Sequence, residues 1–130
     1  MSPSLIKIVQ GFKDNLQGFW SEHFWLIVLF TVSIAADCAT TIFFMLRDGF
    51  GNELHPMFRY AAAQFGCVVG PTLAALVKVA LGILVCIHLR KFAAVIFLTT
   101  SCVSVWAALH NLGGPDHTLF VHIFALVTTF

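Results

Sequence analysis

Apolar residues run through this chain in long stretches that polar residues interrupt at only a few points. The stretches cover about residues 24–46, 67–88, 92–110 and 116–130. A helix rises about 1.5 Å per residue, so about 20 apolar residues cross the roughly 30 Å hydrocarbon layer of a bilayer. The pattern therefore predicts an all-α fold, a polytopic transmembrane bundle of about four helices that forms a single domain over residues 1–130. The last stretch is the shortest, and a tilted, earlier-starting or incomplete crossing is predicted for it.

The first 22 residues follow a different pattern. Apolar side chains recur at helical spacing from Leu5 to Phe19, with lysines, Asp14 and Gln17 between them. Such a mixture is typical of an amphipathic helix that lies in the membrane interface. We expect residues 1–22 to form this interfacial helix and not a cleaved signal peptide, because the polar stretch is too long and no small-residue cleavage site follows.

The composition also indicates an integral membrane protein. Hydrophobic residues make up 59% of the sequence and charged residues only 10%, whereas a soluble domain carries about 25% charged residues. The net charge is +1 without a basic block, so nucleic-acid binding has no electrostatic basis. The cysteines stand in apolar stretches and are expected to behave as small buried hydrophobes: Cys38, Cys67, Cys86 and Cys102.

The distribution of positive charge predicts the orientation in the membrane. The amino-terminal arm and the loop after the second stretch hold Lys7, Lys13, Arg90 and Lys91, whereas the opposite side holds Arg47 and Arg59. Cytoplasmic loops carry the excess of lysine and arginine. The prediction is a multi-pass membrane protein with a cytoplasmic amino terminus.

Two ionisable residues, Asp37 and Lys78, fall in the middle of the first and second stretches. An ionised group at mid-bilayer costs about 2.5–3.5 kcal/mol on insertion scales, so such groups pair or line water. Counted along antiparallel helices, the two residues lie at about the same depth. We predict a structural ion pair between them; the alternative is a carboxylate that couples ion transport.

The two polar turns between stretches one and two and after stretch three face the same side of the membrane. They form a predicted polar face of Glu53, His55, His110 and Asn111, to which Asp116, His117 and His122 are added nearby. Carboxylates and neutral imidazoles are competent zinc or copper ligands. The candidate metal ligands are therefore Glu53, His55, His110, Asp116, His117 and His122. No fixed metal motif is present, and each residue is equally suited to cap a helix or meet lipid headgroups, so no cofactor is predicted.

Haem is a further and weaker alternative, because haem b needs two histidines on facing helices at one depth. His23 and His88 share one membrane boundary, and His110 and His122 share the other. Nucleophilic catalysis lacks support, since no serine or cysteine stands in a nucleophile motif.

Four motifs resemble a family of small prokaryotic four-helix membrane proteins of unknown function. These are Asp37-Cys-Ala-Thr-Thr41, the turn Gly51-Asn-Glu-Leu-His-Pro56, the mid-span Lys78 and the late pair His110-Asn111. They match an Asp-x-x-Thr motif, a Glu-x-Asn-Pro-like turn, a lysine and an asparagine, although His55 replaces the usual asparagine. The resemblance implies a helical bundle in a prokaryotic inner membrane with one connected polar core, formed by Asp37, Glu53, Pro56, Lys78 and Asn111.

These observations favour a non-enzymatic accessory or assembly subunit, bound to another membrane protein or to itself. The chain is short, has almost no mass outside the membrane, and offers fourteen phenylalanines as lipid- or partner-facing surface. The alternatives are a small membrane metalloprotein or enzyme that uses the polar face, and an oligomeric transporter built around Asp37.

Overall fold

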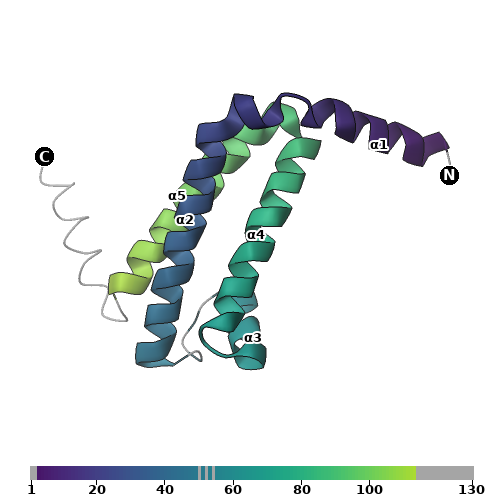
Figure 1. Ribbon diagram of the computed structural model, residues 1–130. Helices are drawn as coiled ribbons and strands as arrows, with labels where there is room; N and C mark the ends of the chain where they lie inside the picture. The colour runs from purple at the N-terminus through teal and green to yellow at the C-terminus, as the bar shows by residue number, and fades with distance from the viewer. Residues whose placement is uncertain (1–2, 50, 52, 54, 114–130) are drawn as a thin grey trace, which may run out of the picture.

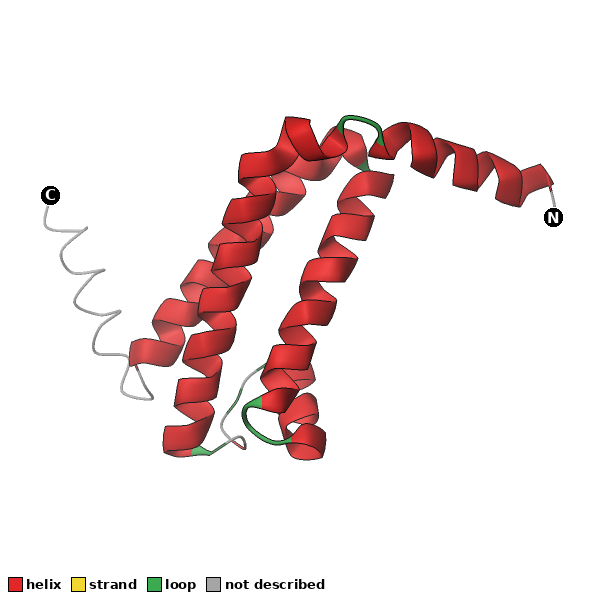
Figure 2. Ribbon diagram, viewed as in Figure 1, coloured by secondary structure: helices red, strands yellow, loops and turns green. Residues whose placement is uncertain are grey.

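A computed structural model describes residues 3–49, 51, 53 and 55–113. Within these ranges the regular elements are helices (Figures 1 and 2). In chain order they are α1 (Pro3–Leu16), α2 (Phe19–Asp48), α3 (Pro56–Phe65), α4 (Val69–His88), the 3₁₀ turn η2 (Arg90–Phe92) and α5 (Ala93–Gly113). The fourth predicted span, residues 116–130, lies outside the described residues.

Three of these helices are long and apolar enough to cross a membrane. They are α2, α4 and the run from Arg90 to Leu112 that contains α5. Each corresponds to one predicted stretch, so an all-helical chain with three candidate spans agrees with the first three predictions. Most of the surface of each span faces outward, as expected where lipid is the solvent.

The first span begins earlier than the sequence suggested. Gly18 adopts a left-handed conformation, with φ of 75°, and separates α1 from α2. Glycine reaches this conformation without the steric cost of a side chain. Residues 19–22, assigned to the interfacial helix from their mixed polarity, therefore belong to α2, which has 30 residues and is about 45 Å long.

Helices α2 and α5 form the most extensive contact in the bundle. Buried positions on α2 recur every three or four residues: Phe30, Ser33, Ile34, Asp37, Cys38, Thr41 and Met45. A matching stripe on α5 consists of Phe97, Ser101, Ser104 and Ala108. The rings of Phe30 and Phe97 meet with centroids 5.1 Å apart. This spacing places one face of each helix against the other.

Helix α4 packs beside α2, and α3 packs under the first turns of α4. The approach of α3 to α4 depends on Gly70, because a Cβ there would lie 2.4 Å from the backbone carbonyl carbon of Ala61. Gly82 plays a comparable role between α4 and α2, since a Cβ at that position would meet the Phe30 ring at 2.4 Å. Small residues let helices come close in membranes.

Helix α1 runs away from the bundle at the end where α2 begins and α4 finishes (Figure 1). Arg90 fastens the junction: its guanidinium donates to the carbonyl oxygens of Asn15 and Gln17 and pairs with Glu22. The Asn15 side chain donates in turn to the carbonyl oxygen of His88. Carbonyl groups at the end of a helix have no helical N–H to bond them. Here the side chain of Arg90, in the turn before α5, donates hydrogen bonds to these carbonyls at the end of α1.

Candidate functional site

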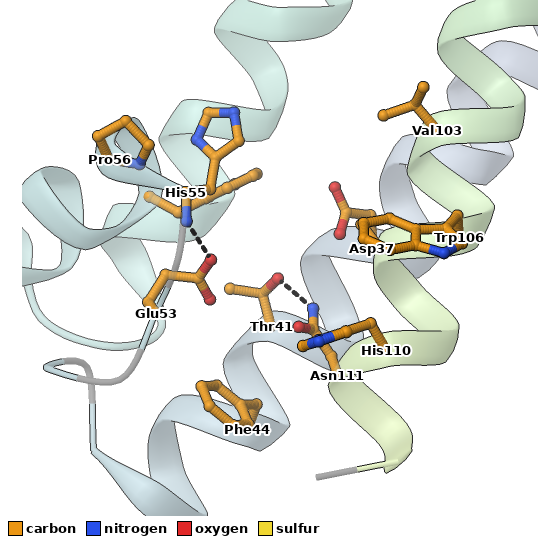
Figure 3. Close-up of a pocket in the computed structure, with 12 residues that line it drawn as sticks. Asp37, Thr41, Phe44, Glu53, His55, Pro56, Val103, Trp106, His110 and Asn111 are labelled. Atoms are coloured by element: carbon orange, nitrogen blue, oxygen red, sulfur yellow. Dashed lines mark hydrogen bonds between the residues drawn. The ribbon is translucent and has the colours of Figure 1, made fainter. Parts of the chain in front are cut away.

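A cavity of about 300 Å³ lies between α2, α3 and α5 (Figure 3). Helix α3 lies at the end of the bundle opposite α1 (Figure 1). Its lining is Asp37, Thr41, Phe44, Glu53, His55, Pro56, Phe58, Val103, Trp106, Ala107, His110 and Asn111. All four residues of the predicted polar face line it. Its inner part is buried at Asp37, Thr41, Glu53 and Phe58, whereas His55 and Trp106 are exposed at its rim.

At the inner end of the cavity, Asp37 meets Lys78. The Lys78 Nζ lies 3.5 Å from Asp37 Oδ2 and 3.2 Å from the hydroxyl of Ser104. Lys78 therefore joins α2 to α5, while its own backbone is on α4. Asp37 is only 4% exposed, so the ammonium group supplies the counter-charge that a buried carboxylate requires.

Glu53 enters the cavity from the segment that precedes α3. Its Oε1 accepts a hydrogen bond of 2.8 Å from the backbone N–H of His55, the residue before the first turn of α3. Pro56 then begins the helix, where a missing N–H carries little cost. The Glu53 residue is 6% exposed, and its second oxygen, Oε2, has no hydrogen-bond partner among the described residues.

Asn111 links α5 to α2 near the mouth of the cavity. Its side-chain amide donates to the Thr41 hydroxyl at 2.8 Å (Figure 3) and also to the Thr40 hydroxyl at 3.4 Å. Thr40 donates in turn to backbone carbonyls of α2. These bonds hold the end of α5 against α2 and fix one wall of the cavity.

Aromatic rings form the rim. The indole of Trp106 lies against the imidazole of His110, with centroids 5.6 Å apart, and the His55 ring meets Phe58 edge-on at 5.1 Å. The cavity therefore combines two buried carboxylates, Asp37 and Glu53, with apolar and aromatic walls (Figure 3).

The structure gathers three candidate metal ligands, Glu53, His55 and His110, around one cavity. The other three, Asp116, His117 and His122, lie outside the described residues. Across residues 3–49, 51, 53 and 55–113, no three or more His, Cys, Asp or Glu side chains are grouped closely enough to hold a metal ion.

The histidines considered for haem occupy dissimilar places. His23 is buried and stacked on Phe19, with centroids 4.9 Å apart, and its Nδ1 has no hydrogen-bond partner among the described residues. His88 is exposed at the end of α4. His110 borders the cavity, and His122 falls outside the described residues.

Sequence reasoning missed the contribution of α5 to the inner end of the cavity. Ser101 and Ser104 are both buried. The Ser104 hydroxyl accepts a hydrogen bond from Lys78, whereas the Ser101 hydroxyl has no hydrogen-bond partner among the described residues. The two serines are three residues apart and share a helix face with Phe97 and Ala108, and this spacing is the sequence feature that could have predicted their burial.

Of the four cysteines, Cys38 and Cys86 are buried, Cys67 is half-buried and Cys102 is exposed.

A second hollow, of about 310 Å³, runs between α2 and α4. Small side chains dominate its lining: Thr31, Ala35, Cys38, Ala39, Thr72 and Ala75. Ala35 and Ala39 are spaced by four residues, the arrangement with which transmembrane helices approach each other closely.

Comparisons with protein-family models, curated proteins and solved structures find no match to this chain.

Proposed function

We propose that this is a non-enzymatic accessory subunit of a membrane complex, and that it works by holding a ligand in the cavity between α2, α3 and α5. The observation that carries this proposal is the Glu53 carboxylate. One of its oxygens is buried at the cavity without a described partner. A buried acceptor atom without a hydrogen bond is costly, and a ligand that donates to this oxygen would remove that cost.

Binding is favoured over ion transport by the state of Asp37. Lys78 already provides a counter-ion at 3.5 Å, and Ser104 fixes the lysine on its other side. A carrier carboxylate must exchange its counter-ion during each cycle. The Asp37–Lys78 pair is better suited to fix the register of α2, α4 and α5 around the cavity.

The accessory role is supported by the hollow between α2 and α4. Four of its small residues, Thr31, Ala35, Ala39 and Thr72, are exposed and offer a close approach to one further transmembrane helix, contributed by a partner membrane protein or a second copy. The resemblance to small prokaryotic membrane proteins and the excess of basic residues at the α1 end extend the proposal to an inner membrane with the amino terminus in the cytoplasm. A single cysteine at Gly51, which is exposed and has open space around it, should then react with an impermeant reagent in intact cells when the chain is otherwise cysteine-free.

The binding role is tested by native mass spectrometry of the protein released from membranes in mild detergent. We expect a non-covalent adduct on the wild-type chain. Ala107→Phe, which fills the cavity from α5, should lose the adduct. Leu98→Phe, at an exposed position on the same helix outside the cavity lining, should retain it. An adduct that survives in both variants, or its absence from all three proteins, would refute a ligand-holding cavity.

A second candidate is a membrane metalloprotein, which is favoured by the convergence of Glu53, His55 and His110 on one cavity. Zinc or copper would need further ligands from outside the described residues. Imidazole binds metal only when neutral, so the affinity for metal should fall as the pH is lowered. Elemental analysis of untagged protein decides the point: near-stoichiometric metal, lost in His55→Ala and His110→Ala, would establish this role.

A further inference from the structure

We propose that the cavity between α2, α3 and α5 binds a primary ammonium group, with the Glu53 carboxylate as its anionic partner. This inference rests on the binding role proposed above and names the chemical class of the ligand. The ammonium belongs to a small organic molecule or to a lipid headgroup, and both present the same R–NH₃⁺ group to the cavity.

Charge at the cavity favours a cation. Two carboxylates, Asp37 and Glu53, belong to the described lining, and this lining contains neither lysine nor arginine. Lys78 compensates Asp37 from α4. The Glu53 carboxylate, in contrast, has no lysine or arginine beside it in the described lining.

Glu53 has one acceptor oxygen that no described residue satisfies. Oε1 already accepts the His55 N–H at 2.8 Å, whereas Oε2 is buried without a described partner. The carboxylate lies between His55 and Thr41 on the cavity side of its segment (Figure 3). A donor that carries positive charge forms the stronger, charge-assisted type of hydrogen bond with such an oxygen.

The walls select an organic cation over a bare metal ion. Phe44, Phe58, Val103, Trp106 and Ala107 supply carbon surface that would remain in contact with an apolar ligand body. Aromatic faces also attract ammonium groups, most strongly that of tryptophan. A metal ion would need several ligands at once, and the described residues do not group three of them.

A primary ammonium fits better than a quaternary one, because Glu53 Oε2 needs an N–H donor.

The cavity reaches well into the bundle from one end. Asp37, in its lining, lies eleven residues before the end of α2 at Asp48, about 16 Å along the helix. The cavity thus extends from the membrane end toward the middle of the bundle.

The test uses Trp106 as a reporter at the rim of the cavity. The chain has three tryptophans, so Trp20→Phe and Trp25→Phe together leave Trp106 as the only one. The protein is placed in phosphatidylcholine nanodiscs and titrated with 2-phenylethylamine, with its N-trimethyl analogue and with 2-phenylethanol. We expect a saturable change in Trp106 emission for the amine, and binding of the other two compounds weaker by about tenfold or more.

Glu53→Gln should weaken binding of the amine by about tenfold or more, because the charge-assisted bond is lost. Asp48→Asn is the matched control, since this carboxylate is at the same membrane end, pairs with Arg47 and is not part of the cavity lining. It should leave the affinity unchanged. Ala107→Phe, which keeps Glu53, should abolish the response and provides a second variant if Glu53→Gln fails to fold.

A second arm identifies the source of the ammonium. If a lipid headgroup occupies the cavity, nanodiscs with half phosphatidylethanolamine should shift Trp106 emission and weaken 2-phenylethylamine binding by competition. If the ligand is a free amine, the lipid exchange should have no effect. Either result supports an ammonium site. Equal binding of the alcohol and the amine, or unchanged affinity in Glu53→Gln, would overturn it; a cavity-dependent adduct of another class would still leave the binding role intact.

Discussion

Separating Asp37 from Lys78 should reveal how much their contact stabilises the bundle. Breaking a fully buried ion pair by removing one partner costs about 3–5 kcal/mol. Here the Lys78 side chain is 22% exposed and the atoms are 3.5 Å apart, at the long end of the range for a hydrogen bond. We therefore expect Lys78→Met to reduce the free energy of unfolding by about 2–3 kcal/mol, because it leaves a buried carboxylate without its cation.

Asp37→Asn should cost less, about 1–2 kcal/mol, since asparagine keeps an acceptor oxygen and Lys78 keeps Ser104. The double variant removes both charges, so its loss should be about 2 kcal/mol smaller than the sum of the single losses. The measurement is reversible unfolding in mixed micelles, followed by circular dichroism as the fraction of denaturing detergent rises.

A control cycle pairs Asp37→Asn with Lys91→Met, a lysine in the 3₁₀ turn at the far end of α4. Those two effects should add within about 0.5 kcal/mol. If the losses at Asp37 and Lys78 add equally well, the two side chains do not stabilise each other, and the reasoning about a register-fixing pair is wrong.

Three further changes test the packing around the site. Gly70→Ala should strongly reduce folded yield because its Cβ would strike the α3 backbone, whereas Gly11→Ala, with open space around it, should be neutral or stabilising in the same yield assay. Asn111→Leu should lower stability by about 0.5–1.5 kcal/mol through the lost bond to Thr41, and Thr41→Val should add little in the double variant, as measured by the same unfolding titration. Arg90→Met should speed hydrogen exchange in the last turn of α1 while leaving α5 protected; unchanged exchange would show that Arg90 does not fasten α1.

The sequence carried most of the information about the helices, because hydrophobic length alone decides which segments can cross a bilayer. It was less informative at the start of α2. There, Glu22 and the neighbouring polar residues resemble an interfacial helix, and only the left-handed backbone of Gly18 shows where one helix ends. Backbone conformation at a single glycine is not encoded in hydropathy.

Counting residues along the antiparallel helices predicted that Asp37 and Lys78 lie at the same depth. The topology predicted that Glu53, His55 and His110 lie at the same end of the bundle. Neither argument could reveal the third element of the site. The rotation of α5 about its axis decides that Ser104 faces Lys78 and that Asn111 faces Thr41. Small hydroxyl residues in an apolar helix give a weak signal by composition, since threonines and serines also occur at outward positions such as Thr99, which bonds to its own helix.

The unequal lengths of α2 and α4 have a consequence for the membrane in which the protein resides. With 30 residues against 20, α2 is longer by ten residues, about 15 Å. A bilayer that matches α4 leaves α2 with surplus helical length, which carries Glu22 at one end and Arg47 and Asp48 at the other, so α2 must tilt or extend into the headgroup region. Changes in lipid thickness should therefore act on the angle between the two helices, and the hollow lined by Ala35, Ala39 and Thr72 lies at that contact. A thicker membrane would favour a more upright α2, which makes the access of a further helix to this hollow dependent on the host bilayer.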